Sequence, residues 1–286
     1  MRIRLEPEDD YMHPREEASN FNESAYYNFF DPGCGLGGWV RLGNRPNEGY
    51  AEMTTCLYLP DGRVAFWFGR PRIGDNDRHD AGGLRFEVVR PFEEHRVAYE
   101  GRVLLLDDPA AMADPTRAFA ESPRVPCRVE QVHRGLAEPW GGEPEPEDGE
   151  APVAVDPEKG FARGHFEQHM AVTGTVTIGD ETFELTDGLG LRDHSWGPRY
   201  WQAIWWYRWL TVNLGPDVGF ATTVSGDEAG GRRAHGFLYD RRVGPGWVPI
   251  RDVDLETDYD DRQVHTPVRV TVHTDERAYE GEGEVL

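Results

Sequence analysis

Apolar and polar residues alternate along most of this chain. Short runs rich in Val, Thr, Tyr, Phe and Trp have a period of two residues, and clusters of Gly, Pro, Asp and Asn separate them. Such alternation is typical of half-buried β-strands, and the clusters are typical of turns. Only residues 109–120 have the pattern of a short helix. The predicted strands are residues 23–30, 37–43, 49–59, 63–69, 84–90, 95–105, 125–134, 164–178, 181–186, 202–214, 218–225, 233–240, 247–253, 266–273 and 278–285.

The pattern predicts an all-β protein of two domains. Many strands with few helices favour barrels or sandwiches that close their own edges. Residues 137–158 contain five prolines, eight acidic residues and no basic residue, a composition that forms no packed core. We interpret them as an acidic, Pro/Gly-rich linker between an N-terminal β domain, residues 1–136, and a C-terminal β domain, residues 159–286. A long surface loop inside one domain is the alternative.

Short motifs recur in the same order in the two halves of the chain. A tryptophan followed ten residues later by glycine occurs at Trp39 and again at Trp209, and Tyr-Glu-Gly occurs at 99–101 and again at 279–281. Together these repeats indicate two copies of one β unit. The second copy ends soon after its Tyr-Glu-Gly motif. We therefore expect the second barrel to be incomplete, or to be completed by another segment or chain.

Charge and composition narrow the classes of partner. The formal net charge of −22 repels phosphate backbones and anionic lipids, so neither nucleic acid nor a membrane surface is an expected partner. No run of 18 apolar residues predicts a membrane span, and the first ten residues lack a secretory signal, so we expect a cytoplasmic protein. Cys34, Cys56 and Cys127 have no metal or disulfide spacing and predict reduced thiols. The oligomeric state stays open.

The segment 192–199 carries the densest group of chemically active side chains. It contains Asp193, His194 and Ser195, and five of the nine tryptophans lie between positions 196 and 209. On a strand, His194 and Trp196 lie on one face, and Asp193 and Ser195 lie on the other. Ionisable groups beside buried indoles are costly unless they are paired or used, so the segment predicts a small-molecule site.

His194 is the candidate acid–base residue, because burial and a carboxylate neighbour bring histidine into the range of proton transfer. Asp193 could orient it if the chain turns at Gly197. Glu23 is a second candidate, as a buried proton donor with a raised pKa. The structural alternative is that Asp193 caps a turn and pairs with Arg199. A Ser–His–Asp triad is excluded, because sequence neighbours on a strand diverge.

His165, Glu167 and His169 share one face if residues 164–178 form a strand. Two histidines and a carboxylate resemble a metal-ligand set, but residues four apart on a strand lie about 13 Å apart, too far for one ion. The better interpretation is a polar stripe that faces a ligand or a partner strand. We therefore predict no metal at these residues.

Trp201, Trp205, Tyr207 and Trp209 alternate on one face of a strand that includes the predicted range 202–214. Packing in a barrel core or pairing with a ring on the neighbouring strand would explain any one of these aromatic residues. As a group they exceed what one small core needs, so we expect an apolar ligand to stack on them. The predicted ligand-binding residues are Trp196, Arg199, Trp201, Trp205, Trp209, Tyr26, Tyr27, His165, Glu167 and Gln168.

Two stretches resemble a known group of proteins. Residues 188–199, Gly-Leu-Gly-Leu-Arg-Asp-His-Ser-Trp-Gly-Pro-Arg, preceded by His-Phe-Glu-Gln at 165–168, are similar to the bacterial uncharacterised branch of the carotenoid 1,2-hydratase/AttH-like superfamily. Residues 22–29 and 38–43 resemble the N-terminal part of that branch. The resemblance implies two tandem lipocalin-like barrels. It maps the family's His-x-Trp pattern onto His194 and Trp196, and residues 219–226 lack the acid that hydratases place downstream.

The resemblance also implies function. Characterised members need no cofactor and hydrate alkenes of terpenoids or prenylated aromatics, or fold polyenes in cyclisations. The first hypothesis is therefore a hydratase, isomerase or cyclase acting on a terpenoid, steroid-like or polyketide substrate. His194 with Asp193 or Glu23 would move the proton, and the indoles would stabilise a carbocation. The second hypothesis is a lipocalin-type binder without chemistry, and the third is a metal-dependent barrel enzyme.

Overall fold

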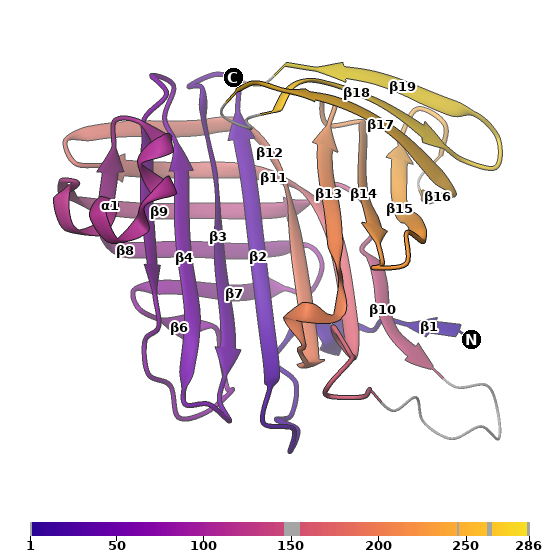
Figure 1. The fold of residues 1–286 in the computed structure, drawn as a ribbon, viewed down its shortest axis with the longest axis horizontal. Helices are drawn as coiled ribbons and strands as arrows, with labels where there is room; N and C mark the ends of the chain where they lie inside the picture. The colour runs from indigo at the N-terminus through magenta and orange to yellow at the C-terminus, as the bar shows by residue number, and fades with distance from the viewer. Residues whose placement is uncertain (1, 146–154, 245, 262–264, 285–286) are drawn as a thin grey trace. The chain divides into compact units, whose positions relative to one another are not determined.

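The computed structural model of this protein describes residues 2–145, 155–244, 246–261 and 265–284, and it is nearly all β (Figure 1). The predicted all-β class is confirmed. Contacts divide the chain into two compact units, Met1–Ala203 and Ile204–Leu286. Each unit has its own sheets and is described by itself. No helix among the described residues is long and apolar enough to cross a membrane.

The first unit contains one 12-stranded antiparallel sheet that closes on itself. The ring runs β11-β12-β2-β3-β4-β5-β8-β9 and returns to β11. A closed antiparallel ring leaves no free edge, and eight strands enclose an interior just wide enough for side chains or one small ligand. The strands are β1 (Arg2–Arg4), β2 (Phe21–Asp31), β3 (Leu36–Arg45), β4 (Tyr50–Tyr58), β5 (Val64–Gly69), β6 (Asp80–Ala81), β7 (Leu84–Arg90), β8 (Glu94–Leu106), β9 (Arg124–Gly135), β10 (Trp140–Glu145), β11 (Gly164–Ile178) and β12 (Glu181–Pro198).

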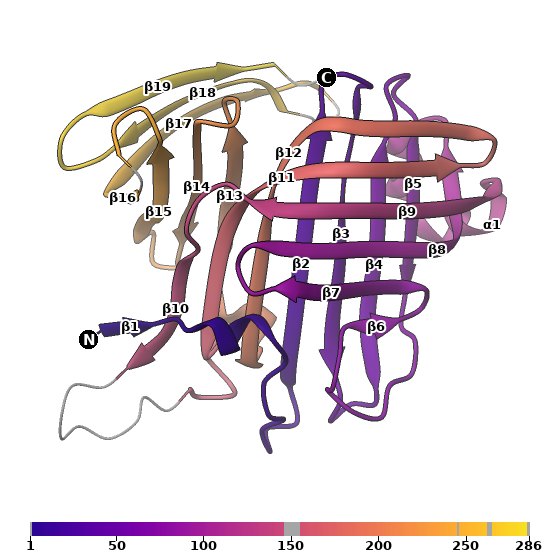
Figure 2. The ribbon, with the colours of Figure 1, turned by 180° about the vertical axis from the view of Figure 1, so that it is seen from behind.

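Two layers of strands cross inside this unit. Figure 2 shows β7, β8, β9 and β11 running across β2, β3 and β4. The core cluster draws on both layers, with residues such as Leu42, Leu57, Val97, Val129 and Met170 buried in it. Each such side chain contributes roughly 1.5–3 kcal/mol by leaving water. The apolar residues of the alternating pattern are therefore the side chains that point into a lipocalin-like barrel.

Helical structure in the first unit is short. The helical pattern of residues 109–120 forms the 3₁₀ helix η2 (Pro109–Ala113) and α1 (Pro115–Glu121). Asp114 caps α1 by accepting from the backbone nitrogen of Arg117. Two further 3₁₀ helices are η1 (Pro7–Asp10) and η3 (Trp201–Ala203). The predicted helix is confirmed, and η1 places the N-terminal segment that completes the site.

The second unit has two smaller antiparallel sheets, of four and three strands. Its core cluster joins Phe220 and Leu238 of the first sheet, through Ile250, to Val253 and Val272 of the second. The strands are β13 (Trp206–Asn213), β14 (Val218–Gly226), β15 (Arg232–Asp240) and β16 (Trp247–Ile250), then β17 (Asp252–Tyr259), β18 (His265–His273) and β19 (Ala278–Gly283).

The predicted linker, residues 137–158, lies between strands of a single sheet. β10 occupies Trp140–Glu145 of the linker, and residues 146–154 lie outside the described residues. β9 and β11, one on each side, pair along their length, with Met170 opposite Gly135. The boundary between the two compact units lies later in the chain, after Ala203. β11 and β12 thus complete the first barrel, because β12 pairs with β2.

β12 is the strand that positions the site. It pairs with β11 on one edge and, from Leu189 to Pro198, with β2 on the other. The strand predicted at 181–186 therefore continues as β12 through the segment 192–198 without a turn. Gly190 permits the close approach of β2, since a Cβ there would lie 1.9 Å from the carbonyl oxygen of Asn28.

Candidate active site

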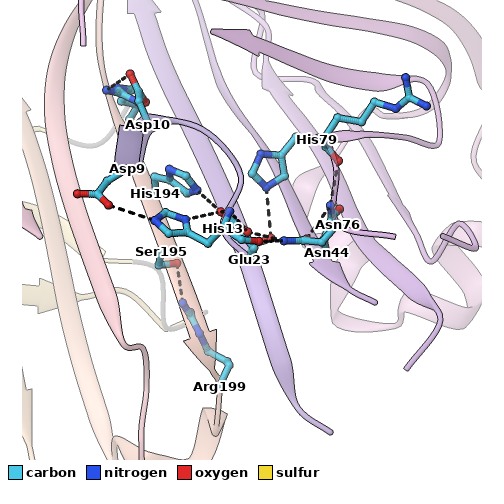
Figure 3. Close-up of polar contacts among 12 residues, drawn as sticks. Asp9, Asp10, His13, Glu23, Asn44, Asn76, His79, His194, Ser195 and Arg199 are labelled. Atoms are coloured by element: carbon cyan, nitrogen blue, oxygen red, sulfur yellow. Dashed lines mark hydrogen bonds and ion pairs between the residues drawn. The ribbon is translucent and has the colours of Figure 1, made fainter. Parts of the chain in front are cut away.

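A buried carboxylate, Glu23 of β2, is the centre of the candidate site. It accepts from Nδ1 of His13 at 2.8 Å, from the backbone nitrogen of His13 at 3.0 Å and from Nε2 of His194 at 3.0 Å (Figure 3). Nδ2 of Asn76 donates to its other oxygen at 2.5 Å. Burial raises the pKa of Glu23, but the hydrogen bonds and charges of the His13 and His194 side chains more than offset it and hold the pKa at about 2. The expected raised pKa is wrong, so Glu23 is a fixed anion and not a proton donor.

His194 is held by that anion. Because an ionised carboxylate only accepts, Nε2 of His194 must carry the proton in the contact with Glu23. The described residues provide no partner for Nδ1 of the same ring. Nδ1 is therefore left for a ligand, to which it offers a lone pair when the ring is neutral and a proton when the ring is charged.

His194 lines a cavity of about 340 Å³ on the inner face of the first barrel. Small-molecule sites usually have volumes of roughly 300–1,000 Å³, so this cavity suits a compact ligand. Its apolar wall is formed by Ala25, Tyr27, Phe86 and Val88, and its polar wall includes Asp10, His79, Arg192 and His194.

Two residues of the polar wall, Arg192 and Asp10, form a buried ion pair. Arg192, two residues before His194, donates from Nη1 to Oδ1 of Asp10 at 2.5 Å. Oε1 of Gln168 accepts from Nε and Nη2 of Arg192 at 3.0 and 2.9 Å. Burial raises the pKa of Asp10, but Arg192 and His95 more than offset it and hold it well below its usual value. Gln168, a predicted ligand-binding residue, is thus engaged in positioning Arg192.

The other face of β12 carries a second group of polar residues. Oδ2 of Asp193 lies 2.7 Å from Nε2 of His165, and Oε1 of Glu167 lies 3.6 Å from the same nitrogen. Burial lowers the pKa of His165, but Asp193 more than offsets it and raises the pKa above its usual value. The hypothesis that Asp193 orients His194 is wrong, because β12 stays extended and places the two side chains on opposite faces.

Two triplets have ligand atoms within 4.8 Å of one another, His13–Glu23–His194 and His165–Glu167–Asp193. In the first triplet, Nδ1 of His13 and Nε2 of His194 both contact Oε1 of Glu23, the oxygen that would otherwise bind a cation. In the second, Asp193 replaces the His169 of the predicted stripe, and the positive charges of Arg199 and Arg41 act on it. In both triplets the ligand atoms contact one another directly, Glu23 with His13 and His194 and Asp193 with His165.

The predicted aromatic residues belong to both units, and of those in the first unit Tyr27 lines the cavity. Trp196 is buried and stacks on His13 at 3.8 Å between ring centroids, behind His194. Tyr27 lines the cavity, whereas Tyr26 faces the other side and stacks on Trp39. Trp201 lies in η3 and is 42% exposed. Trp205 and Trp209 belong to the second unit, and Trp205 is 66% exposed.

The expected continuous strand 202–214 begins only at Trp206, which breaks the alternation that the sequence suggested for Trp201 and Trp205. Within the first unit, the aromatic rings of Tyr27 and Phe86 line the cavity.

Sequence reasoning missed His13, Asn76 and His79. His13 follows η1, and the other two lie in the loop before β6, where no periodicity marks a residue for a site. His79 contacts the carbonyl oxygen of Glu23 at 3.3 Å. Burial, with the charge of His194, lowers the pKa of His79 to about 4, so it is neutral near pH 7.

The closed ring of β-strands around a small cavity defines the class of this protein, an all-β chain with a lipocalin-like barrel. The chain belongs to the family described as domain of unknown function DUF7064, whose model matches residues 6–286. No curated protein matches the sequence.

Solved structures share this fold. A candidate AttH protein from Nitrosomonas europaea is similar with a TM-score of 0.59 and 13% identity, covering 98% of this chain and 95% of that one. Kievitone hydratase from Nectria haematococca is similar with a TM-score of 0.54 and 8% identity, covering 93% of this chain and 76% of that one. At the level of the fold, the resemblance to the AttH-like superfamily is confirmed.

Proposed function

We propose that this protein is a cofactor-independent enzyme of the hydratase, isomerase or cyclase type that moves a proton with His194. The observation that carries the proposal is the pairing of His194 with an ionised, fully buried Glu23 at 3.0 Å, at the wall of a closed-barrel cavity. Such a carboxylate fixes the ring tautomer and stabilises the charged ring. The shared fold with a protein named as a hydratase is consistent with this chemistry.

The proposed reaction begins with proton transfer from His194. Charged His194 donates its Nδ1 proton to an alkene carbon of the substrate, which leaves a carbocation on the neighbouring carbon. The aromatic rings of Tyr27 and Phe86, which line the cavity, would stabilise this cation. Water then adds to the cation and loses its proton to Nδ1, or the substrate loses a neighbouring proton to Nδ1. The first outcome is hydration and the second is isomerisation, and in both His194 regains its starting charge.

The substrate that suits this cavity is a compact, mainly apolar alkene such as a terpenoid or a prenylated aromatic. The test is incubation of the purified protein with a panel of such alkenes in isotopically labelled water, followed by mass spectrometry. We expect label in the product, and we expect His194→Gln to reduce turnover by roughly 10²–10⁴-fold, as for loss of a general acid–base group. His273→Gln, an exposed histidine paired with Asp254, is the matched control and should leave turnover unchanged.

Two results would contradict the proposal. One is a folded His194→Gln variant with undiminished turnover. The other is tight binding of an alkene to the wild type with no product, which would favour the lipocalin-type binder instead. Ligands that co-purify from the native host, identified by mass spectrometry, give the substrate class directly.

A further inference from the structure

Arg199 is a buried cation that forms no direct ion pair with the nearby carboxylates of Asp193 and Glu52. It is 6% exposed, and Nη2 donates to Oγ of Ser195 at 2.6 Å (Figure 3). Among the residues that the structure describes, Arg199 forms no ion pair, and its buried Nε has no hydrogen-bond partner. In a chain with a net charge of −22, a buried guanidinium without a counter-ion is costly and calls for an explanation.

The side chains of Asn22 and Arg41 lie on the same face of the sheet and also have buried polar atoms without a hydrogen-bond partner among the described residues. Both side-chain polar atoms of Asn22, which is fully buried, and Nη2 of Arg41 lack a partner within the described part of the chain. A Cβ added at Gly43 would lie 2.7 Å from Nη2 of Arg41 and 3.1 Å from Oδ1 of Asn22. The two groups therefore reach the same point above Gly43.

The strand register brings these groups to Arg199. Ser195 of β12 is opposite Ser24 of β2, and Ser24 is opposite Gly43 of β3. Side chains directly opposite in antiparallel strands share a face. The guanidinium carbons of Arg199 and Arg41 both lie over the ring of Trp201, at 5.0 and 5.5 Å from its centroid.

The nearby acids are already used. Oε2 of Glu52 pairs with Nη1 of Arg41 at 3.3 Å, and Asp193 pairs with His165. The unused donors are therefore those of Arg199, Arg41 and the Asn22 amide. Guanidinium groups match the planar, two-oxygen shape of carboxylates and the oxygens of phosphate.

We propose that Arg199, Arg41 and Asn22 form a binding site for an oxyanion, a carboxylate or phosphate group of a small ligand, on the outer face of the first barrel. Phe161 and Trp201 flank Arg199 and would contact the apolar part of such a ligand, since Phe161 lies 4.1 Å from the guanidinium carbon. The site is distinct from the inner cavity of His194, because β12 separates the two faces. It does not depend on the proposed catalysis.

The test is titration of the full chain with benzoate and, separately, inorganic phosphate at constant ionic strength set by chloride. Binding is followed by tryptophan fluorescence and by the thermal midpoint. We expect saturable binding of at least one probe. Arg199→Gln should weaken it at least ten-fold, whereas Arg128→Gln, an exposed arginine paired with Glu130, and His194→Gln should leave it unchanged.

Gly43→Ala provides a second variant in case Arg199→Gln does not fold. Its methyl group would occupy the position of the Arg41 guanidinium, so it should weaken the same probe. Benzoate binding alone identifies a carboxylate site, and phosphate binding alone identifies a phosphate site. The proposal is overturned if the wild type binds neither probe saturably, or if His194→Gln weakens binding while Arg199→Gln and Gly43→Ala do not.

Discussion

One residue, Glu23, determines the charge of the candidate active site. Backbone and side-chain donors from three different segments converge on its two oxygens. A carboxylate so bonded stays ionised far below neutral pH and keeps the Nε2 proton on His194. His194, and not the acid, is then the group that exchanges protons with a ligand.

The first prediction at this scale concerns Glu23→Gln. The amide replaces one accepting oxygen with a donor that faces the N–H groups of His13 and Asn76. We expect the free energy of unfolding to fall by about 3 kcal/mol, the scale for breaking a buried charged network. Urea denaturation measures it, and the exposed Glu87→Gln should change it by less than about 0.5 kcal/mol. Equal effects of the two substitutions would refute the role of Glu23.

Sequence alternation was sufficient to place His194 and Trp196 on one face and Asp193 and Ser195 on the other. It could not identify which carboxylate meets His194, because Glu23 is 171 residues away and the contact depends on β2 pairing with β12. His13 and Asn76 come from segments outside regular strands. Their positions depend on tertiary contacts, which single-chain periodicity does not encode.

At the scale of elements, β12 connects the two candidate sites. Its inner face presents Arg192 and His194 to the cavity, and its outer face presents Asp193 and Ser195. Gly164 of β11 lies opposite Trp196, and the indole covers it. The stack of Trp196 on His13 therefore depends on the absence of a side chain at position 164.

A substitution tests this dependence. A Cβ at Gly164 would lie 2.1 Å from Cζ2 of Trp196, so Gly164→Ala must displace the indole. We expect a loss of about 2 kcal/mol in stability, as for an overpacked core, together with a changed tryptophan emission spectrum. Gly74→Ala is the control, because a Cβ there meets nothing within 4 Å. A spectrum and stability equal to those of the wild type would show that Trp196 is not held as described.

Most long strands could be predicted from period-two alternation, since each buries one face of the barrel. β1, β6 and β10 were missed because they are two to six residues long and rich in polar residues or glycine. The strand predicted at 202–214 was too long at its start. The spacing of the tryptophans in this segment fits an alternating strand, but Trp201 belongs to η3 and β13 begins only at Trp206.

At the scale of the whole molecule, buried neutral histidines make stability depend on pH. Burial is the largest cause that lowers the pKa of His79 and His95 to about 4 and of His133 to about 3. Arg192 faces His95 and His133 and adds to the effect, whereas Asp10 opposes it at His95. Each pKa is below the 6.5 of an unfolded histidine, so the unfolded chain binds more protons as the pH falls.

We therefore expect the full contribution of these histidines above about pH 6.5 and its loss as the pH falls toward about 4. Glu23 has a depressed pKa, so its contribution is complete above about pH 4.5 and is lost toward about pH 2. Each titrating group adds a slope of at most about 1.4 kcal/mol per pH unit. Urea denaturation across this range measures the slope, and His133→Leu should reduce it. A free energy of unfolding independent of pH between 4 and 6.5 would contradict the burial of these rings.

The pairing of β2 with β12 has a consequence for synthesis on the ribosome. β2 emerges early, but its partner strand β12 is translated only after about 160 further residues. Until then the nascent chain exposes an unpaired strand edge, and the acid that governs the inner cavity remains in water. Barrel closure must therefore wait until translation has passed residue 198, and any pause before that point prolongs a state prone to aggregation.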